Sequence, residues 1–143
     1  MSEPRKLPST IHSPAAFNRS PAAGADGVFN WNWTKGCFDK LDKIGPMDFD
    51  GVVERNGQFL VFETKDAGKA IPRGQFITLI QAHALGCFTI MLVEGKEAPE
   101  RGRIWWPSCK ISKDNMGQEF VGLESARGLV RAWYLNADKG APF

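Results

Sequence analysis

The sequence contains few of the residues that build disulfide frameworks and zinc sites. Its 143 residues include three cysteines, Cys37, Cys87 and Cys109, which lie far apart and form no C-x-x-C pair. A disulfide framework and a zinc site are therefore not indicated, and the three thiols are expected to be buried in a reducing compartment. The two histidines are isolated as well, and His83 is expected to be a helix-surface or core residue.

Long hydrophobic runs and a strong excess of one charge are also missing. No apolar run approaches the roughly 20 residues of a membrane-spanning helix, and the first residues lack the apolar core of a secretory signal. We therefore expect a cytoplasmic protein with no membrane partner. The formal net charge of +2 permits a nucleic-acid partner without establishing one.

The first part of the chain differs in composition from the rest. Residues 1–27 are rich in proline, alanine and serine and show no apolar periodicity, which predicts an extended, flexible arm. Residues 28–143 are expected to form a single domain. With 43% hydrophobic residues in the whole chain, that domain can bury a substantial core.

A hairpin is the best-defined element of the sequence. Asn56-Gly57 separates two segments rich in valine and phenylalanine, residues 48–55 and 58–65. Because both central residues of a two-residue hairpin turn take positive φ, Asn-Gly is the strongest short-range hairpin signal. The register that follows places Asp50 opposite Glu63 and Asp48 opposite Lys65.

The hairpin brings acidic side chains onto one face of the sheet. Directly opposite residues share a face, and like charges placed there are destabilising. The second strand is apolar on both faces, so it is expected to lie in the sheet interior, where a carboxylate must be paired or bind a metal. A hard divalent cation such as Mg²⁺ would satisfy Asp50 and Glu63 together. The alternative is a solvated sheet edge on which Lys65 neutralises both acids.

Three segments together resemble a known family. They are Pro46-Met47-Asp48-Phe49-Asp50, Phe62-Glu63-Thr64-Lys65 after the short hairpin, and Gly74-Gln75 at the start of an expected helix. This pattern resembles the PD-(D/E)XK, or restriction-endonuclease-like, nucleases. It is most similar to small phage-type members related to VRR-NUC domains and Holliday-junction resolvases. The resemblance covers about residues 45–95.

The resemblance implies a fold and an activity. The fold would be an α/β restriction-endonuclease-like core, a mixed β-sheet with an antiparallel hairpin and a parallel crossover strand, flanked by helices. The activity would be metal-dependent hydrolysis of DNA, with selectivity for branched, recombination or replication intermediates as a further expectation. Asp50, Glu63 and the backbone carbonyl of Thr64 would bind Mg²⁺, with Mn²⁺ as a substitute, and Lys65 would be the catalytic lysine. Many resolvase-like nucleases are dimers, so a homodimer is a further expectation.

Four more residues are candidates for supporting roles. Asp48 either orients Lys65 through an ion pair or lies at the mouth of the strand. Gln75 either reaches back to the site or its substrate, or is an amide at the edge of the core. Lys69 and Arg73 either contact substrate phosphates from the rim of the site or belong to a solvated loop.

Hydrophobic periodicity predicts three helices. A short helix within Phe29–Leu41, capped by Thr34, is expected to pack on the sheet, with Trp31 and Trp33 either closing the core edge or stacking on DNA bases. A second helix over Gln75–Leu85 should be largely buried. A third from Leu123 to Tyr134 should pack on the second face of the sheet, or else form a dimer interface.

Two further strands are expected. Phe88–Val93 is an apolar run that should form a buried strand, parallel to the strand of Glu63 because a helix connects the two. Arg103–Pro107 should form a short edge strand, since Pro107 cannot donate to a ladder.

Two other classes of function stay open from the residues alone. One is a nucleic-acid-binding module that keeps the nuclease fold without turnover. The other is an inhibitory or structural protein whose tryptophans and last helix bind a protein partner. Both leave the facing acids unexplained, because binding alone does not require two carboxylates on one face beside a phosphate.

Overall fold

In the computed structural model the described residues are 31–41, 44–112 and 114–143. The chain divides into two compact units, Met1–Met47 and Asp48–Phe143, and each is considered by itself. The arm expected over residues 1–27 lies outside the described residues. None of the helices in the described ranges is long and apolar enough to cross a membrane.

The predicted helix within Phe29–Leu41 is wrong over its described part. The only helical element there is a single 3-10 turn, η1 (Asn32–Thr34), in which the Thr34 hydroxyl donates to the Trp31 carbonyl at 2.8 Å. Gly36 then adopts a φ of +79°, which a helix does not allow. Asp39 accepts backbone N–H bonds from Leu41 and Ile44, and such local side-chain bonds compete with helix formation.

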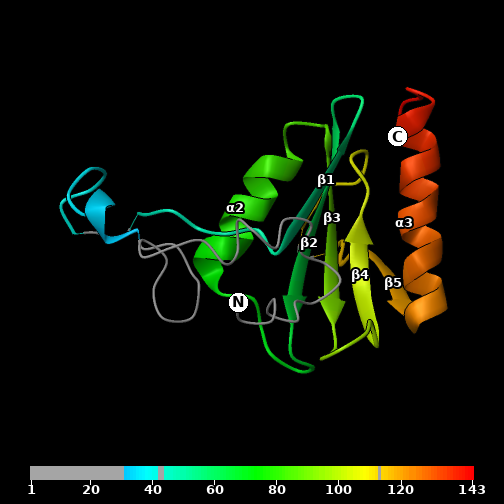
Figure 1. Ribbon diagram of the computed structural model, residues 1–143, viewed down its shortest axis with the longest axis horizontal. Helices are drawn as coiled ribbons and strands as arrows, with labels where there is room; N and C mark the ends of the chain where they lie inside the picture. Colours follow the sequence, from blue (N-terminus) through cyan, green and yellow to red (C-terminus); the bar gives the residue numbers. More distant parts are fainter. Residues whose placement is uncertain (1–30, 42–43, 113) are drawn as a thin grey trace, which may run out of the picture. The chain divides into compact units, whose positions relative to one another are not determined.

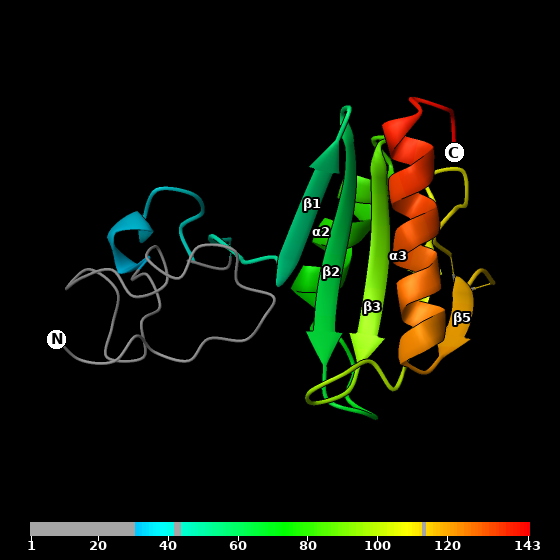
Figure 2. The ribbon, with the colours of Figure 1, turned by 45° about the vertical axis from the view of Figure 1, so that its right-hand side comes forward.

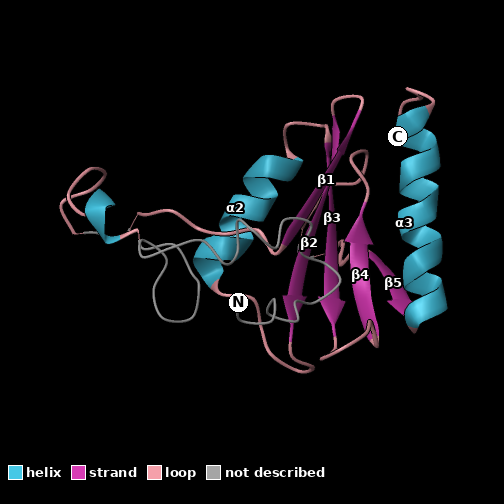
Figure 3. Ribbon diagram, in the orientation of Figure 1, coloured by secondary structure: helices cyan, strands magenta, loops and turns pink. Residues whose placement is uncertain are grey.

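The second unit is an α/β structure built on a five-stranded mixed sheet (Figures 1 and 3). The strand order in space is the order in sequence, and β2 and β3 are parallel while the other neighbours are antiparallel. The strands are β1 (Gly51–Arg55), β2 (Gln58–Lys65), β3 (Phe88–Glu94), β4 (Arg101–Trp105) and β5 (Gln118–Val121).

The hairpin and its register are confirmed. Asn56 and Gly57 have φ values of 53° and 78°, the two positive angles that the turn requires. Gly51 pairs with Phe62 and Arg55 with Gln58, the register expected from the sequence. The Asn56 side chain also donates to the Ala137 carbonyl at 3.0 Å, which ties the turn to the last helix of the unit.

A helix covers each face of the sheet (Figure 2). The α2 helix (Arg73–His83) places Leu79 against apolar side chains of β2, β3 and β4, and it connects β2 to the parallel strand β3, as predicted. The α3 helix (Leu123–Asp138) packs Ala126, Trp133 and Ala137 against the opposite face, which confirms the role expected for the last helix. Alternating residues of β2 therefore point to two different cores.

Burial of α2 is less complete than its sequence suggests. The helix begins at Arg73 and ends at His83, so Leu85 lies beyond it and is exposed. Within the helix, Phe76 and Ile77 remain 39% and 46% exposed, because only one helix face meets the sheet. His83 is a core residue, and its Nε2 lies 2.8 Å from the Trp106 carbonyl oxygen.

The expected edge strand at Arg103–Pro107 is an interior strand. The β4 strand ends at Trp105, so Pro107 lies outside the ladder and does not prevent pairing on either side. The β5 strand pairs along the outer side of β4, for example Arg103 with Glu119. The β5 strand has two polar residues followed by two apolar ones, so it lacks the alternation that marks a strand.

Candidate functional site

The side chains of Glu63 and Lys65 in β2 point to the face of the sheet that α2 covers. Val61, Glu63 and Lys65 are every second residue of the strand, so they share one face of the sheet. Val61 belongs to the apolar cluster beneath α2. Glu63 pairs in register with Leu92 of β3, a residue of the same cluster, and Lys65 pairs with Glu94. The apolar cluster therefore gives way to charged side chains at the ends of β2 and β3.

Glu63 is a buried carboxyl group with an unsatisfied oxygen. The residue is only 4% exposed, and its Oε2 has no hydrogen-bond partner among the described residues. Burial, and secondarily the charge of Asp50, raise the pKa of Glu63 to about 7. A buried polar atom without a partner is rare in folded proteins, so we expect this oxygen to bind a proton or a cation.

Asp50 lies at the open end of the hairpin, hydrogen-bonded to Thr64, the residue after Glu63. Asp50 directly precedes the last ladder pair, Gly51 and Phe62, and its charge acts on Glu63. Its Oδ2 accepts two bonds from Thr64, from the backbone N–H at 2.7 Å and from the hydroxyl at 2.9 Å. Asp50 is exposed, so the pair joins one solvated and one buried carboxyl group.

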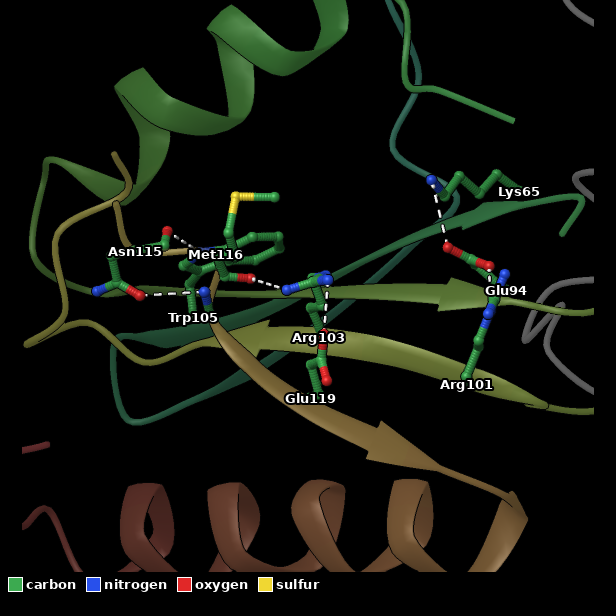
Figure 4. A network of polar contacts seen from close by, with 9 residues as sticks. Lys65, Glu94, Arg101, Arg103, Trp105, Asn115, Met116 and Glu119 are labelled. Carbon is green, nitrogen blue, oxygen red and sulfur yellow. Dashed lines mark hydrogen bonds and ion pairs between the residues drawn. The ribbon is translucent and has the colours of Figure 1, made fainter. Parts of the chain in front are cut away.

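Lys65 has a partner that the sequence did not suggest. Its Nζ lies 3.4 Å from Oε1 of Glu94, and Oε2 of Glu94 accepts a 2.8 Å hydrogen bond from Nε of Arg101 (Figure 4). The hydrogen bond from Arg101 and the charge of Lys65 lower the pKa of Glu94. Three neighbouring strands thus each contribute one member of a charged row.

Glu94 was missed because the predicted strand ended one residue too early. Phe88–Val93 was expected to run parallel to β2, and one further residue places a carboxylate beside Lys65. The ion pair considered between Asp48 and Lys65 is not present in the part of the chain that the structure describes. Asp48 is exposed and precedes β1, at the mouth of the strand.

The other supporting candidates are less closely connected to the carboxylates. Lys69 forms an exposed ion pair with Asp66 at 3.5 Å, and Arg73 is the first residue of α2. Gln75 lies in the first turn of α2 and is half-buried. Across the described ranges, no hydrogen bond or ion pair links these side chains to Asp50 or Glu63.

Comparisons with known proteins give no relative. No family model matches the chain, and no match was found among curated proteins or among solved structures. The site must therefore be interpreted from its own geometry and chemistry.

The donor atoms at Asp50 and Glu63 suit a hard divalent cation. Mg²⁺ is usually bound through one or two carboxylates and completes its shell with water and substrate phosphate oxygens. Glu63 supplies a buried oxygen without a partner, and Oδ1 of Asp50 is not among the atoms that Thr64 contacts. No group of three or more His, Cys, Asp or Glu side chains that could hold a metal ion occurs among the described residues, so the other ligands would have to be backbone carbonyls, water or substrate.

Proposed function

We propose that this protein is a metal-dependent nuclease that hydrolyses DNA phosphodiester bonds, with branched recombination or replication intermediates as its substrates. The observation that carries the proposal is Glu63, a buried carboxyl group with a partnerless oxygen, next to a second carboxylate and two residues before a lysine. Binding of a divalent cation would offset the free-energy cost of burying the charged carboxylate of Glu63.

The arrangement of elements supports the proposal. A hairpin, a crossover helix and a parallel strand follow one another, and Glu63 and Lys65 lie at the end of the hairpin's second strand. This is the arrangement implied by the resemblance to PD-(D/E)XK nucleases, and we propose a restriction-endonuclease-like core on that basis. Pro46 to Asp50 and Phe62 to Lys65 carry the matching motif.

The net charge of the acidic and basic side chains gives a reason for a cation at this site. With every group ionised, Asp50, Glu63 and Glu94 contribute three negative charges against two positive charges from Lys65 and Arg101, a net charge of −1. A DNA phosphate would be repelled by that net charge. One divalent cation reverses its sign, so the substrate would bind a site of net charge +1.

In the proposed mechanism the side chains have distinct roles. Asp50 and Glu63 would hold Mg²⁺, with the Thr64 carbonyl as a third ligand by resemblance. When bound, the ion would lower the pKa of a water ligand and neutralise charge on the scissile phosphate. Lys65 lies two residues from Glu63 on the same face, where its ammonium group orients the attacking water or stabilises the pentacovalent transition state.

A nuclease panel tests the proposal. The purified protein is incubated with four-way junction, flap, linear and circular DNA in the presence of Mg²⁺, Mn²⁺ or EDTA. We expect cleavage with either metal and none with EDTA. Glu63→Gln and Lys65→Ala should abolish it, while Glu119→Gln, which changes a carboxylate of the same sheet outside the proposed site, should cleave like the wild type. Metal-dependent cleavage that persists in highly purified Lys65→Ala protein would reject the role of the lysine.

A catalytically inactive nucleic-acid-binding module is a second candidate, because one observation favours it. Asp50 already has a structural role, since Thr64 donates two hydrogen bonds to its Oδ2. A binding module would shift the mobility of DNA equally with Mg²⁺ and with EDTA and would cleave no substrate of the panel.

A further inference from the structure

We propose that Glu94 is a positioning residue that holds the ammonium group of Lys65 in place for the reaction. The inference rests on the proposed function, because it assigns a role to a neighbour of the proposed catalytic lysine. It starts from the contact between Lys65 Nζ and Glu94 Oε1 at 3.4 Å. Glu94 itself would touch neither the metal nor the substrate.

The backbone places the two residues side by side. Lys65 and Glu94 are register partners at the ends of the parallel strands β2 and β3. Just beyond this pair, the Gly95 N–H donates to the Lys65 carbonyl at 3.2 Å, so the strand ends remain joined. With its backbone fixed in this way, Lys65 has freedom only along its side chain, and the Glu94 carboxylate restricts that remaining freedom.

The pair is partly shielded from water. The side chains of Lys65 and Glu94 are 19% and 16% exposed, whereas that of Arg101 is 60% exposed. Exposed ion pairs rarely hold a lysine in one geometry, because solvent screens the attraction and the long side chain loses entropy. A pair with little exposure is screened less, so Glu94 restrains Lys65 more strongly than a surface carboxylate would.

Arg101 keeps Glu94 turned toward the lysine. Its Nε donates to Oε2 of Glu94 at 2.8 Å, which leaves Oε1 for Lys65 (Figure 4). Backbone bonding supports the same arrangement, since the Glu100 N–H donates to the Glu94 carbonyl at 2.9 Å. Both carboxylate oxygens are thus engaged by cationic side chains, which fits a positioning role better than a role as metal ligand.

Kinetics of three variants test the inference. Glu94→Gln keeps the size of the side chain and removes its charge, and we expect kcat to fall about 10–100-fold, the range found when a residue that orients a metal ligand is lost. KM for DNA and the half-saturating Mg²⁺ concentration should stay within about twofold, because neither ligand contacts Glu94. Arg101→Gln, which loosens Glu94 but leaves it in place, should give a smaller fall in kcat.

The control is Glu119→Gln. Glu119 forms an ion pair with Arg103 at 2.6 Å between β4 and β5, also between register partners of the same sheet. Loss of this pair should leave kcat within about twofold of the wild type. An unchanged kcat in Glu94→Gln, or a fall as large in Glu119→Gln, would overturn the inference.

A spectroscopic readout separates this inference from the proposed function. In protein labelled with ¹⁵N-lysine, the side-chain nitrogen signal of Lys65 is assigned by its loss in Lys65→Arg. Restraint by Glu94 predicts a distinct signal in the wild type that merges with those of mobile lysines in Glu94→Gln. A signal that does not change overturns the positioning role. If the wild type cleaves no DNA, the proposed function fails, and the lysine signal still decides whether Glu94 holds Lys65.

Discussion

Thr64 donates both its backbone N–H and its hydroxyl to one oxygen of Asp50, at 2.7 and 2.9 Å. Asp50 precedes β1, so no ladder pair fixes it, and Thr64 takes over that role from the neighbouring strand. Because Thr64 directly follows Glu63, these two bonds tie Asp50 to the residue next to Glu63. The motif Glu63-Thr64-Lys65 therefore organises the site from both faces of β2.

Replacing Thr64 by valine removes the hydroxyl and keeps the branched shape and the backbone bond. We expect a loss of about 1 kcal/mol or less in the free energy of unfolding, because one hydrogen bond at an exposed position is lost. Mg²⁺ affinity should fall, since Asp50 becomes less restrained. Denaturant unfolding and calorimetric Mg²⁺ titration measure the two effects. Thr64→Ser, which keeps the hydroxyl, is the control, and equal Mg²⁺ affinity in all three proteins would contradict the restraint.

The raised pKa of Glu63 predicts how stability depends on pH in the absence of metal. The pKa of this group is 4.5 ordinarily and about 7 in the folded protein, so between these values the folded state keeps a proton that the unfolded state releases. Raising the pH through this window therefore favours unfolding. The lowered pKa of Glu94 acts in the opposite direction at lower pH. Denaturant unfolding of wild type and Glu63→Gln across the window isolates the Glu63 contribution, which disappears in the variant.

The same pKa predicts competition between protons and metal. Glu63 must lose its proton to bind Mg²⁺, so affinity should increase as the pH rises from about 6 to about 8, with protons released on binding. Calorimetry in two buffers of different ionisation enthalpy measures the number of protons released. Binding that is equally tight at both pH values would show that Glu63 is not a ligand.

The hairpin turn gives a prediction about the backbone. Gly57 has a φ of +78°, so Gly57→Ala should lower the free energy of unfolding by about 1–2 kcal/mol. The control is Gly128→Ala within α3, where an added Cβ meets no atom within 4 Å and the change should stabilise by up to about 1 kcal/mol. Urea unfolding compares them, and equal effects at the two glycines would contradict the turn geometry.

The two faces of α2 should differ in their sensitivity to substitution. Leu79 is 2% exposed beneath the helix, so Leu79→Ala should cost about 2–5 kcal/mol of unfolding free energy. Ile77 is 46% exposed on the same helix, and Ile77→Ala should cost far less. Thermal and urea unfolding distinguish the two variants. A large loss at Ile77 would show that this face is buried in solution.

Short-range signals in the sequence sufficed for much of the fold. Asn56-Gly57 favours one turn type, and that turn alone set the register of β1 against β2 from Gly51–Phe62 to Arg55–Gln58. The apolar run at Phe88–Val93 and the helix before it likewise implied the parallel strand. These predictions depended on neighbouring residues only.

The fold predictions that failed did so either because the local pattern was misread or weak, or because the outcome depended on tertiary contacts. Over its described part, the helix within Phe29–Leu41 failed because Gly36 and Asp39 favour turns, and β5 was missed because its polar and apolar residues do not alternate. Glu94 could be placed beside Lys65 only once the pairing of β2 with β3 was known, since sequence alone does not fix the register of parallel strands. The exposed face of α2 depends in the same way on how the helix lies on the sheet.

The central claim is that Asp50 and Glu63 hold a divalent cation, and crystals soaked in Mn²⁺ test it most directly. The account predicts an anomalous peak within about 2.2 Å of Oε2 of Glu63, with Asp50 as a second ligand. The peak should be absent in Glu63→Gln crystals treated in the same way. Well-ordered wild-type crystals that show no peak at this oxygen, or a protein hydrogen bond that already occupies it, would contradict the claim.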